Sequence, residues 1–381
     1  MSVIALLLLV VLAVASFGLL NVLANIAFAE RARRCTKRPL PNYPFVSVLV
    51  PARNEAHTIG RCVRSLLEQD YPNYELIVLN DGSTDATGAI LDQLAREHPQ
   101  LRVIHADQPL PAGVNGKSRA CQRLAEAAQG EWLLFTDADT AHRHDSIRRG
   151  LAAARGLNVA LFSAIPRQEL GSWAERLFVP AGFTMIYNVV SFWALRYTRS
   201  MHWGNAAAIG QYALVRRDVY FACGGHRAIQ TKILDDVSLG ELIKRAGYRI
   251  AIGDADWVRC RMYRGWGEMV AGFSKNAFAV LKGSFALSAV FVASALLLFY
   301  LPLLGLALPG LDPSARAAAG AIVGLTLANF ALVAWRLGQP AWLCALYPAQ
   351  IAIGLGILLN SIRWRVTGRA QWKGRSLAGA S

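Results

Sequence analysis

Two carboxylates separated by one residue, Asp137 and Asp139, lie near the end of the segment EWLLFTDADT. The apolar residues before them predict a buried strand that ends where the acids begin. Carboxylates in this arrangement are hard oxygen ligands for a divalent cation such as Mg²⁺ or Mn²⁺, and they leave coordination positions open for phosphate oxygens. The alternative is a solvated strand end that carries two acids.

Polar residues follow two other apolar runs in the same way. Asp81 comes directly after YELIVLN and begins the segment DGSTD, in which Gly82 permits a tight turn. Glu55 follows VSVLV within the segment PARNE, and Thr58 is a candidate cap for the next helix. Each segment, taken alone, is also what an ordinary turn with a helix cap looks like.

The polar segments alternate with predicted strands and helices. Short apolar runs predict strands at 46–50, 74–79, 101–106, 131–136 and 158–163, and the stretches between them predict helices at 58–69, 87–98, 118–129 and 145–155. This alternation is typical of an α/β doubly wound sheet. Ligands bind beyond the carboxyl ends of the strands in such sheets, which is where PARNE, DGSTD and DADT fall.

Long apolar segments flank the α/β region. Residues 1–30 are almost wholly apolar and could cross the roughly 30 Å hydrocarbon core of a bilayer as one helix. The basic segment RARRCTKR follows this stretch, and no clear cleavage site is present, which favours a retained anchor over a removed signal peptide. Three further stretches, at 285–308, 317–335 and 341–361, could also span.

One more apolar stretch, at 176–197, lies inside the α/β region. If it spanned, the chain before it and the chain after it would lie on opposite sides of the membrane. Pro180, Gly182 and the flanking arginines favour instead a broken helix lying in the membrane interface.

The composition agrees with a membrane protein. Hydrophobic residues make up 54% of the 381 residues and charged residues only 17%, which is too apolar for a water-soluble chain of this length. The net charge is +15, and five basic residues lie in each of two clusters beside apolar segments, at 31–38 and 363–375. Because this is a juxtamembrane pattern, nucleic-acid binding is not needed to explain the charge. The six cysteines show no short metal-ligand spacing, so reduced thiols are expected.

The ordered set VSVLVPARNE, LNDGSTD, GK, TDAD and LDDVSLGELIKRAGYRI resembles family 2 glycosyltransferases with the GT-A fold. The resemblance covers about residues 46–278. The N-terminal anchor, the apolar C-terminal segments, PLPAGVNGKSRA, LDDVSL and WKGR are similar to the membrane branch that includes hopanoid-associated, carotenoid and ceramide glycosyltransferases. The resemblance implies a GT-A doubly wound mixed sheet, a UDP-sugar donor and a lipid acceptor.

The resemblance also implies roles for single residues. Glu55 and Asp81 would contact the uridine of the UDP-sugar, and Lys117 would lie near the nucleotide. Asp139, helped by Asp137, would hold Mg²⁺ or Mn²⁺ on the diphosphate.

The acids of LDDVSL are implied to carry the proton transfer. Asp236 matches the acid that acts as general base in the family, which removes the proton of the acceptor hydroxyl while the metal stabilises the leaving diphosphate. The family usually has Glu at the position of Asp235, so Asp235 departs from its pattern. A carboxylate at a helix start can also be only a cap. Gln211 and the Gly224–Gly225 turn are candidates for the acceptor side.

The segment RMYRGW partly matches a Gln/Arg-x-x-Arg-Trp element of processive and ceramide-type relatives, but it is one residue too long. The resemblance implies that Arg264 and Trp266 contact the diphosphate or the acceptor. Trp266 could equally be an aromatic residue of the membrane interface.

Two other features of the sequence suggest different chemistry, but the residues support each of them less well than they support the glycosyltransferase resemblance. PAGVNGKS resembles a phosphate-binding Walker A segment, but Pro111 stands where the first glycine belongs and removes an amide from the phosphate cradle. His142 follows DADT and is interpreted as a surface histidine rather than as a metal ligand.

The combined expectation is an integral protein of the cell inner membrane with a cytoplasmic catalytic domain. It would transfer a sugar from a UDP-sugar to a hydroxyl of a hopanoid, carotenoid or sphingolipid-like acceptor, with no nucleic-acid partner. A polyprenyl-phosphate glycosyltransferase and a non-catalytic membrane scaffold are the alternatives, and the complete set of acids disfavours the scaffold. The predicted organisation is an anchor at 1–30, a basic linker at 31–45, a catalytic domain at 46–283 with an interfacial helix near 173–197, membrane segments at 284–362 and a basic tail at 363–381.

Overall fold

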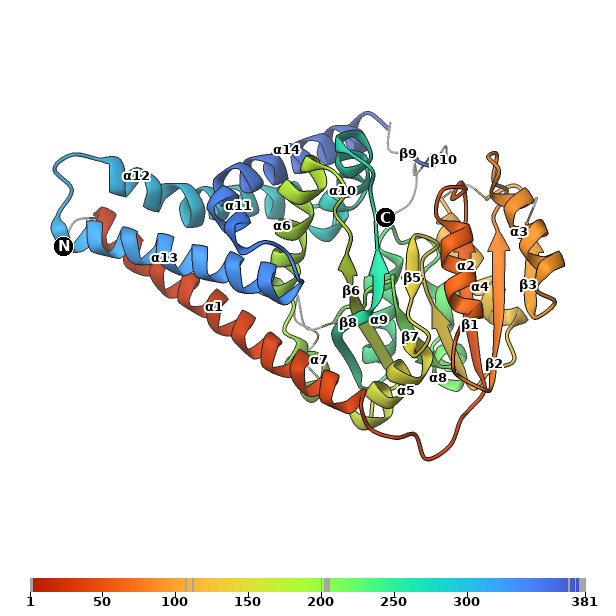
Figure 1. Cartoon of the computed structure of the whole chain (residues 1–381). Helices are drawn as coiled ribbons and strands as arrows, with labels where there is room; N and C mark the ends of the chain where they lie inside the picture. Colours follow the sequence, from red (N-terminus) through yellow and green to blue (C-terminus); the bar gives the residue numbers. More distant parts are fainter. Residues whose placement is uncertain are drawn as a thin grey trace. The chain divides into compact units, whose positions relative to one another are not determined.

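The computed structural model describes residues 3–106, 108–111, 113–199, 201, 206–368, 371–373 and 375–376. The chain forms two compact units (Figure 1). One is a helical unit made of Met1–Ile26, Leu170–Ser191 and Tyr263–Ala370, and the other is an α/β unit made of Ala27–Glu169, Phe192–Met262 and Gln371–Ser381.

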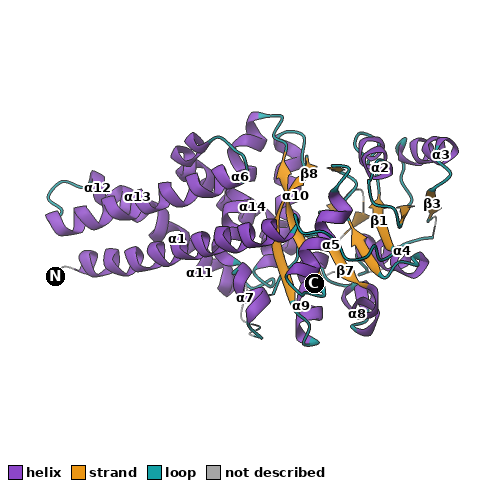
Figure 2. Cartoon of the chain, turned by 60° about the horizontal axis from the view of Figure 1, so that its bottom comes forward, coloured by secondary structure: helices purple, strands orange, loops and turns teal. Residues whose placement is uncertain are grey.

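A mixed sheet of eight strands is the centre of the α/β unit, and its order is β3-β2-β1-β4-β7-β6-β8-β5. Figure 2 shows strands in orange and helices in purple. The strands are β1 Val46–Ala52, β2 Tyr74–Asn80, β3 Leu101–His105, β4 Trp132–Phe135, β5 Thr140–His142, β6 Leu161–Gln168, β7 Ala213–Arg216 and β8 Ile250–Cys260. All five predicted strands are present, as β1, β2, β3, β4 and β6.

The first half of the sheet is parallel. Strands β1, β2 and β3 are neighbours in that order, and β4 pairs with the other side of β1. The chain therefore reverses its direction of travel across the sheet between β3 and β4. With right-handed crossovers, the helices between β1, β2 and β3 cover one face and the helix before β4 covers the other, which is the predicted doubly wound arrangement. The carboxyl ends of β1 and β4 border this reversal point.

The second half of the sheet contains the strands that the sequence pattern did not predict. Strand β7 pairs antiparallel with both β4 and β6, and β5 pairs antiparallel with β8. Strands β6 and β8 run parallel, with a register irregularity between Pro166 and Arg167. These pairings make the sheet mixed.

Helices pack against the sheet through short apolar faces. The helices and turns of this unit are α2 Ile59–Leu67, α3 Thr87–Glu97, α4 Gly116–Ala127, α5 Ser146–Gly156, α7 Phe192–Tyr197, α8 Arg217–Ala222, a 3₁₀ turn η1 Gly225–Ile229 and α9 Asp235–Arg245. Cys62, Val63 and Leu66 of α2 and Leu124 of α4 are fully buried, as are Leu49 and Val50 of β1. Burial of such side chains stabilises the unit by roughly 1.5–3 kcal/mol each.

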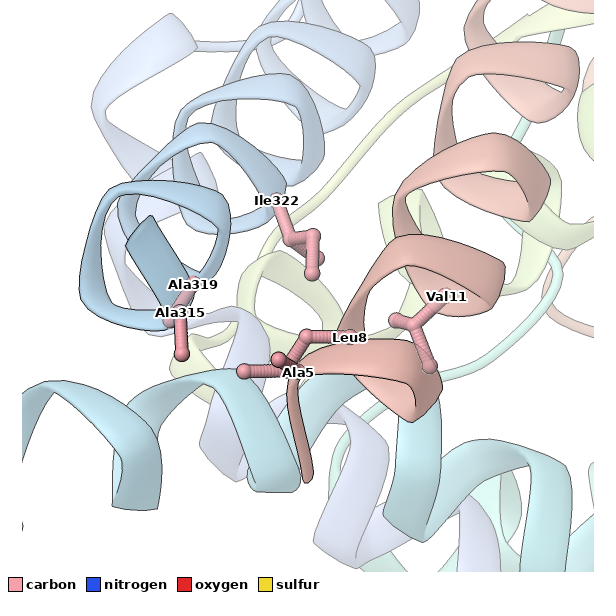
Figure 3. Close-up of a cluster of buried hydrophobic side chains, with 6 residues drawn as sticks. All are labelled: Ala5, Leu8, Val11, Ala315, Ala319 and Ile322. Atoms are coloured by element: carbon pink, nitrogen blue, oxygen red, sulfur yellow. The ribbon is translucent and has the colours of Figure 1, made fainter. Parts of the chain in front are cut away.

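The helical unit contains long, apolar helices. They are the first part of α1 (Val3–Cys35), α6 Trp173–Val189, α10 Trp266–Val280, α11 Phe285–Ala295, a π-helical turn η2 Leu296–Tyr300, α12 Leu301–Ala307, α13 Pro313–Arg336, a 3₁₀ turn η3 Ala341–Leu346 and α14 Tyr347–Val366. Helices α1 and α13 pack through Ala5, Leu8 and Val11 on one side and Ala315, Ala319 and Ile322 on the other (Figure 3).

Four helical segments among the described residues are long and apolar enough to cross a membrane. They are Ile4–Cys35, Phe285–Ala307, Pro313–Arg336 and Ala341–Val366. The four predicted apolar segments are confirmed by this finding, and they place the protein at a membrane.

Helix α6 and helix α7 form the broken apolar segment that the sequence predicted at 176–197. The break lies at Val190–Ser191, and Pro180 lies inside α6. Asn25 donates hydrogen bonds from its side-chain amide to the carbonyl oxygens of Tyr187 and Val190, so the final carbonyls of α6 are satisfied at the break. Strand β4 before α6 pairs with strand β7 after it. We therefore expect the chain before α6 and the chain after α7 to lie on the same side of the membrane, and the interfacial position of α6 stays a prediction.

Candidate active site

The loops after β1 and β2 are joined by hydrogen bonds. Asn54, with a φ of 51°, donates its backbone N–H to Ser83 Oγ at 3.0 Å, and its side-chain oxygen accepts the backbone N–H of Thr84 at 2.8 Å. The backbone N–H of Glu55 donates to Thr87 Oγ1 at 2.8 Å. The segments PARNE and DGSTD therefore form one rigid edge that fixes the carboxylates of Glu55 and Asp81.

Thr58 occupies the N-cap position of α2, as predicted, but its side chain makes no capping bond. Its hydroxyl instead lies 3.1 Å from a carboxylate oxygen of Glu55. Asp85 accepts the backbone N–H groups of Thr87 and Ala56. Thr58 thus holds a candidate ligand-binding acid rather than a helix terminus.

Lys117 is the central cation of the site. Its Nζ lies 2.6 Å from Asp137 Oδ1 and 3.9 Å from Asp235 Oδ2. Burial alone would lower the pKa of Lys117, but the carboxylates of Asp137 and Asp235 outweigh burial, so the pKa is raised well above its usual value. Lys117 is therefore charged and holds acids from two different elements together.

The side chain of Asn115 caps the helix that carries Lys117. It accepts the backbone N–H groups of Lys117 at 2.9 Å and Ser118 at 3.4 Å, so α4 begins at Gly116, two residues before its predicted start. These are the amides that a Walker A loop would offer to phosphate. Because Asn115 occupies them, the structure does not support a P-loop site here.

Asp236 faces the same pocket from the start of α9. One carboxylate oxygen accepts the backbone N–H of Gly210 at 3.0 Å, and the other accepts that of Val237 at 2.8 Å. Burial raises the pKa of Asp236, and the neighbouring charge of Asp235 raises it further. One carboxylate oxygen therefore accepts an amide of α9, and the other accepts an amide from across the pocket.

A small pocket connects these groups. Its lining residues are Pro51, Lys117, Cys121, Phe135, Thr136, Asp137, Ala208, Gly210, Ala213, His226, Asp235, Asp236 and Leu239. A Cβ atom on Gly210 would lie 3.0 Å from Lys117 Nζ and 3.4 Å from Asp236 Cβ. Glycine at this position thus allows the lysine and the acids to converge.

Asp139 is half-buried in the loop after β4 and fits the role of a metal ligand. Its Oδ1 atom is buried and makes no hydrogen bond within the described part of the chain. Burial raises the pKa of Asp139 to about 7, with further contributions from Asp137 and Glu55. A buried carboxylate oxygen without a donor is suited to a cation. The described residues contain no group of three acidic, histidine or cysteine side chains placed to hold a metal ion.

His142 is buried, not on the surface, so the prediction for it is wrong. Its ring nitrogens lie within 3.1 Å of the hydroxyls of Thr136, Thr140 and Ser146. Burial lowers the pKa of His142 to about 3, so the ring is neutral. The pattern missed this because β5 had not been predicted. The histidine therefore supports the DADT loop through its contacts with the hydroxyls of Thr136 and Thr140.

Of the residues predicted for the acceptor side, Gln211 does not line the pocket, whereas the Gly224–Gly225 turn precedes a residue that does. Gln211 is buried and donates to Cys260 Sγ at 3.0 Å, and it is not among the residues that line the pocket. Gly224 and Gly225 have positive φ angles of 86° and 54° and form the turn before η1. This turn contributes the next residue, His226, to the pocket.

Arg264 and Trp266 belong to the helical unit, whereas the acids belong to the α/β unit. The backbone N–H of Arg264 donates to Glu268, and that of Gly265 donates to the buried carboxylate of Glu175. Trp266 is 52% exposed. Glu175 therefore fixes the RGW turn, and the role of Arg264 and Trp266 stays a prediction.

The basic tail supplies two site residues that the sequence analysis assigned only to the membrane surface. Lys373 forms an ion pair with Glu55, and Arg375 forms one with Asp81. Arg53 joins them by donating from Nε to the carbonyl oxygen of Lys373 at 3.2 Å. The two acids predicted to contact uridine are thus each paired with a residue of the WKGR segment.

The tail contacts predict the membrane topology of the chain. Since Lys373 and Arg375 touch the α/β unit, the tail must lie on the same side of the membrane as that unit, so an even number of crossings separates them. Three candidate spans lie between residues 285 and 366, so we predict that at least one of them does not cross. Single cysteines introduced at Gln93 and at Thr367 should react with a membrane-impermeant maleimide from the same side. Opposite labelling would contradict the docked tail.

Comparison with known proteins shows similarity to glycosyltransferases. Residues 47–234 match the family described as "Glycosyl transferase family 2". The chain is 27% identical over 259 residues to a 4,4'-diaponeurosporenoate glycosyltransferase of Staphylococcus aureus strain N315, with 65% of each chain covered. The corresponding protein of strain MRSA252 is 27% identical over 245 residues, covering 62% of this chain and 61% of the relative. The chain thus matches slightly less than two thirds of the length of these relatives.

A solved structure confirms the fold class. A mannosyltransferase from Pyrobaculum calidifontis, in complex with GDP-Man and Mn²⁺, superposes with a TM-score of 0.52 at 21% identity, covering 92% of this chain and 99% of that one. The α/β unit is therefore GT-A-like, as the sequence predicted.

Proposed function

We propose that this chain, a membrane member of glycosyltransferase family 2, transfers a sugar from a UDP-sugar to a hydroxyl group of a lipid. The observation that carries the proposal is the convergence of Lys117, Asp137, Asp235 and Asp236 on one pocket beyond the strand ends. These residues come from three separate elements, and no structural requirement of the sheet brings them together.

The donor would lie along the edge formed by the loops after β1, β2 and β4. Glu55 and Asp81 would accept hydrogen bonds from the nucleoside, and Asp137 and Asp139 would hold Mg²⁺ or Mn²⁺. When bound, the cation would neutralise charge on the leaving diphosphate. Lys117 would add a fixed positive charge beside the same phosphates. Arg264 and Trp266 are proposed as further contacts of the diphosphate or the acceptor.

Asp236 would act as the base of an inverting transfer. A carboxylate whose pKa is raised by burial is a stronger proton acceptor, and it suits removal of a hydroxyl proton as the acceptor oxygen attacks the sugar. The bonds to Gly210 and Val237 hold the carboxylate in one orientation. Asp235 stays beside Lys117 and would orient it.

The lipid acceptor is supported by the apolar helices of the chain. Four candidate spans and the non-spanning helix α6 would keep the pocket near the bilayer, where the hydroxyl of a hopanoid, carotenoid or sphingolipid-like molecule is accessible. The relative named for diaponeurosporenoate supports a carotenoid-like acceptor. The basic clusters favour the cytoplasmic side of the inner membrane for the catalytic unit.

Lipid mass spectrometry tests this proposal directly. Total lipids from cells that produce the protein should contain a glycosylated lipid that is missing in cells producing the Asp236→Asn variant. The mass difference from the free lipid identifies the sugar. Equal lipid profiles in both cell types would contradict a lipid acceptor. Accumulation of a polyprenyl-phosphate sugar would favour polyprenyl phosphate as the acceptor.

A further inference from the structure

Lys373 and Arg375 of the WKGR segment contact the edge formed by the loops after β1, β2 and β4, which is called the donor edge below. Strands β9 (Gln371–Trp372) and β10 (Arg375–Ser376) pair antiparallel within the α/β unit. Lys373 follows β9 and pairs with Glu55, and Arg375 belongs to β10 and pairs with Asp81. Nη2 of Arg375 also lies 3.2 Å from the backbone oxygen of Asp81 and 3.3 Å from its Oδ1. The guanidinium thus contacts both oxygens of one carboxylate.

Gly116 leaves room for the Arg375 guanidinium. A Cβ atom on Gly116 would lie 2.6 Å from Arg375 Nη1 and 3.2 Å from Asp81 Oδ2. Gly116 is also the first residue of α4, the helix that carries Lys117. The edge is therefore shaped to accept the arginine beside the central lysine of the pocket.

The tail neutralises the two acids of the loops after β1 and β2. In the described part of the chain, the ion pairs of Glu55 and Asp81 are those with Lys373 and Arg375. Arg53 donates to the carbonyl oxygens of Asp81 and Gly82 rather than to a carboxylate, and Lys117 pairs with Asp137. A nucleoside diphosphate brings further negative charge to this edge. Lys373 and Arg375 neutralise the two acids that would otherwise repel it.

Asp81 can bind Arg375 and a ligand at the same time. An ionised carboxylate has about four lone-pair sites. The Arg375 contact uses only part of that capacity, so a donor group of a nucleobase can still be accepted. The Arg375–Asp81 pair also presents N–H donors directly beside an acceptor, a pattern that can match the alternating groups on the edge of a base.

We propose that Lys373 and Arg375 are donor-binding residues, and that the WKGR segment is a structural part of the site for the nucleoside diphosphate portion of the sugar donor. The inference rests on the proposed function, because it assigns partners for the same donor. The rest of this site is built from the loops after β1, β2 and β4. The inference adds to it a binding element that follows the last candidate membrane span in the sequence.

Binding of UDP and GDP with Mg²⁺ to the purified full-length protein tests the proposal. Arg375→Ala and Lys373→Ala should each weaken the nucleotide that the wild type binds by about 10- to 100-fold, since a charge-assisted hydrogen bond is lost. Arg375→Lys should recover part of the affinity because it restores the charge. In turnover assays, the loss should appear mainly as a higher KM for the sugar donor.

The control is Arg363→Ala, which removes one positive charge from an exposed position of α14 outside the α/β unit. It should bind nucleotide as the wild type does, and thermal unfolding of every variant checks that the chain is folded. Unchanged affinity in folded Arg375→Ala and Lys373→Ala overturns the inference and leaves the proposed function intact. Tighter binding overturns it as well, since the tail would then obstruct the site. A wild type that binds neither nucleotide overturns both.

Discussion

Replacing Asp139 by alanine is expected to lower sugar transfer by at least about 10³-fold at any practical Mg²⁺ or Mn²⁺ concentration. A metal ion supplies several kcal/mol of stabilisation to the leaving diphosphate, and each 1.36 kcal/mol is tenfold in rate. The buried Oδ1 of Asp139 has no hydrogen bond to lose within the described chain. The isosteric variant Asp139→Asn should therefore remain folded and still lose activity, as measured by transfer of radiolabelled sugar to lipid.

The matched control for this change is Asp218→Ala. Asp218 is an exposed acid of the same unit, is paired with Arg216 and does not line the pocket. It should retain wild-type turnover. Excess EDTA should inactivate the wild-type enzyme, and added Mg²⁺ or Mn²⁺ should restore it. Full activity in EDTA, or in folded Asp139→Ala, would remove the metal from the proposed mechanism.

The second large effect concerns the base. Asp236→Asn should reduce turnover by about 10²- to 10⁴-fold, which is the usual contribution of general base catalysis, while the affinity for the nucleotide changes little. Asp235→Asn should cost much less, because that acid orients Lys117 rather than accepting the proton. Single-turnover rates and nucleotide affinities measured for both variants separate the chemical step from binding.

The two variants also distinguish the acceptor classes. A phosphate acceptor is already anionic and needs no base, so near-wild-type turnover in Asp236→Asn would rule out the hydroxyl mechanism and favour a polyprenyl phosphate. A larger loss for Asp235→Asn than for Asp236→Asn would show that the other carboxylate is the base.

The pH dependence of turnover follows from the raised pKa of Asp236. Its base form is present only above that pKa, which burial and Asp235 raise above the usual carboxyl range. Turnover should therefore fall as the pH decreases through the raised value, at a higher pH than an ordinary aspartate would give. This acidic limb should be absent from the residual activity of Asp236→Asn. An identical limb in both proteins would assign the titration to another group.

Much of the first half of the sheet could be predicted from the sequence, because its signals are local. Each parallel strand is a short apolar run followed at once by its polar loop, as in YELIVLN and DGSTD. The position of Asp81 after β2 and of Asp137 after β4 follows from that order alone. The position of these acids at the strand ends could therefore be predicted from their spacing in the sequence.

The rest depends on pairings between distant segments. Strand β7 has only four residues and gains its identity from the antiparallel contact with β4. His142 is buried because β5 joins β8, which lies more than a hundred residues later. The ion pair of Lys373 with Glu55 joins residues 318 positions apart. Periodicity carries no information about such contacts, and the charge pattern of the tail suggested a lipid surface instead.

The docking of the WKGR segment has a consequence for the order in which the protein is made. Ribosomes synthesise all eight strands of the sheet and the three candidate spans of residues 285–366 before Lys373 and Arg375. Until these residues emerge, Glu55 and Asp81 lack these two cationic partners. If the proposed role of the WKGR segment holds, a molecule whose synthesis stops within the membrane helices would therefore bind nucleotide sugars more weakly than the molecule that carries Lys373 and Arg375.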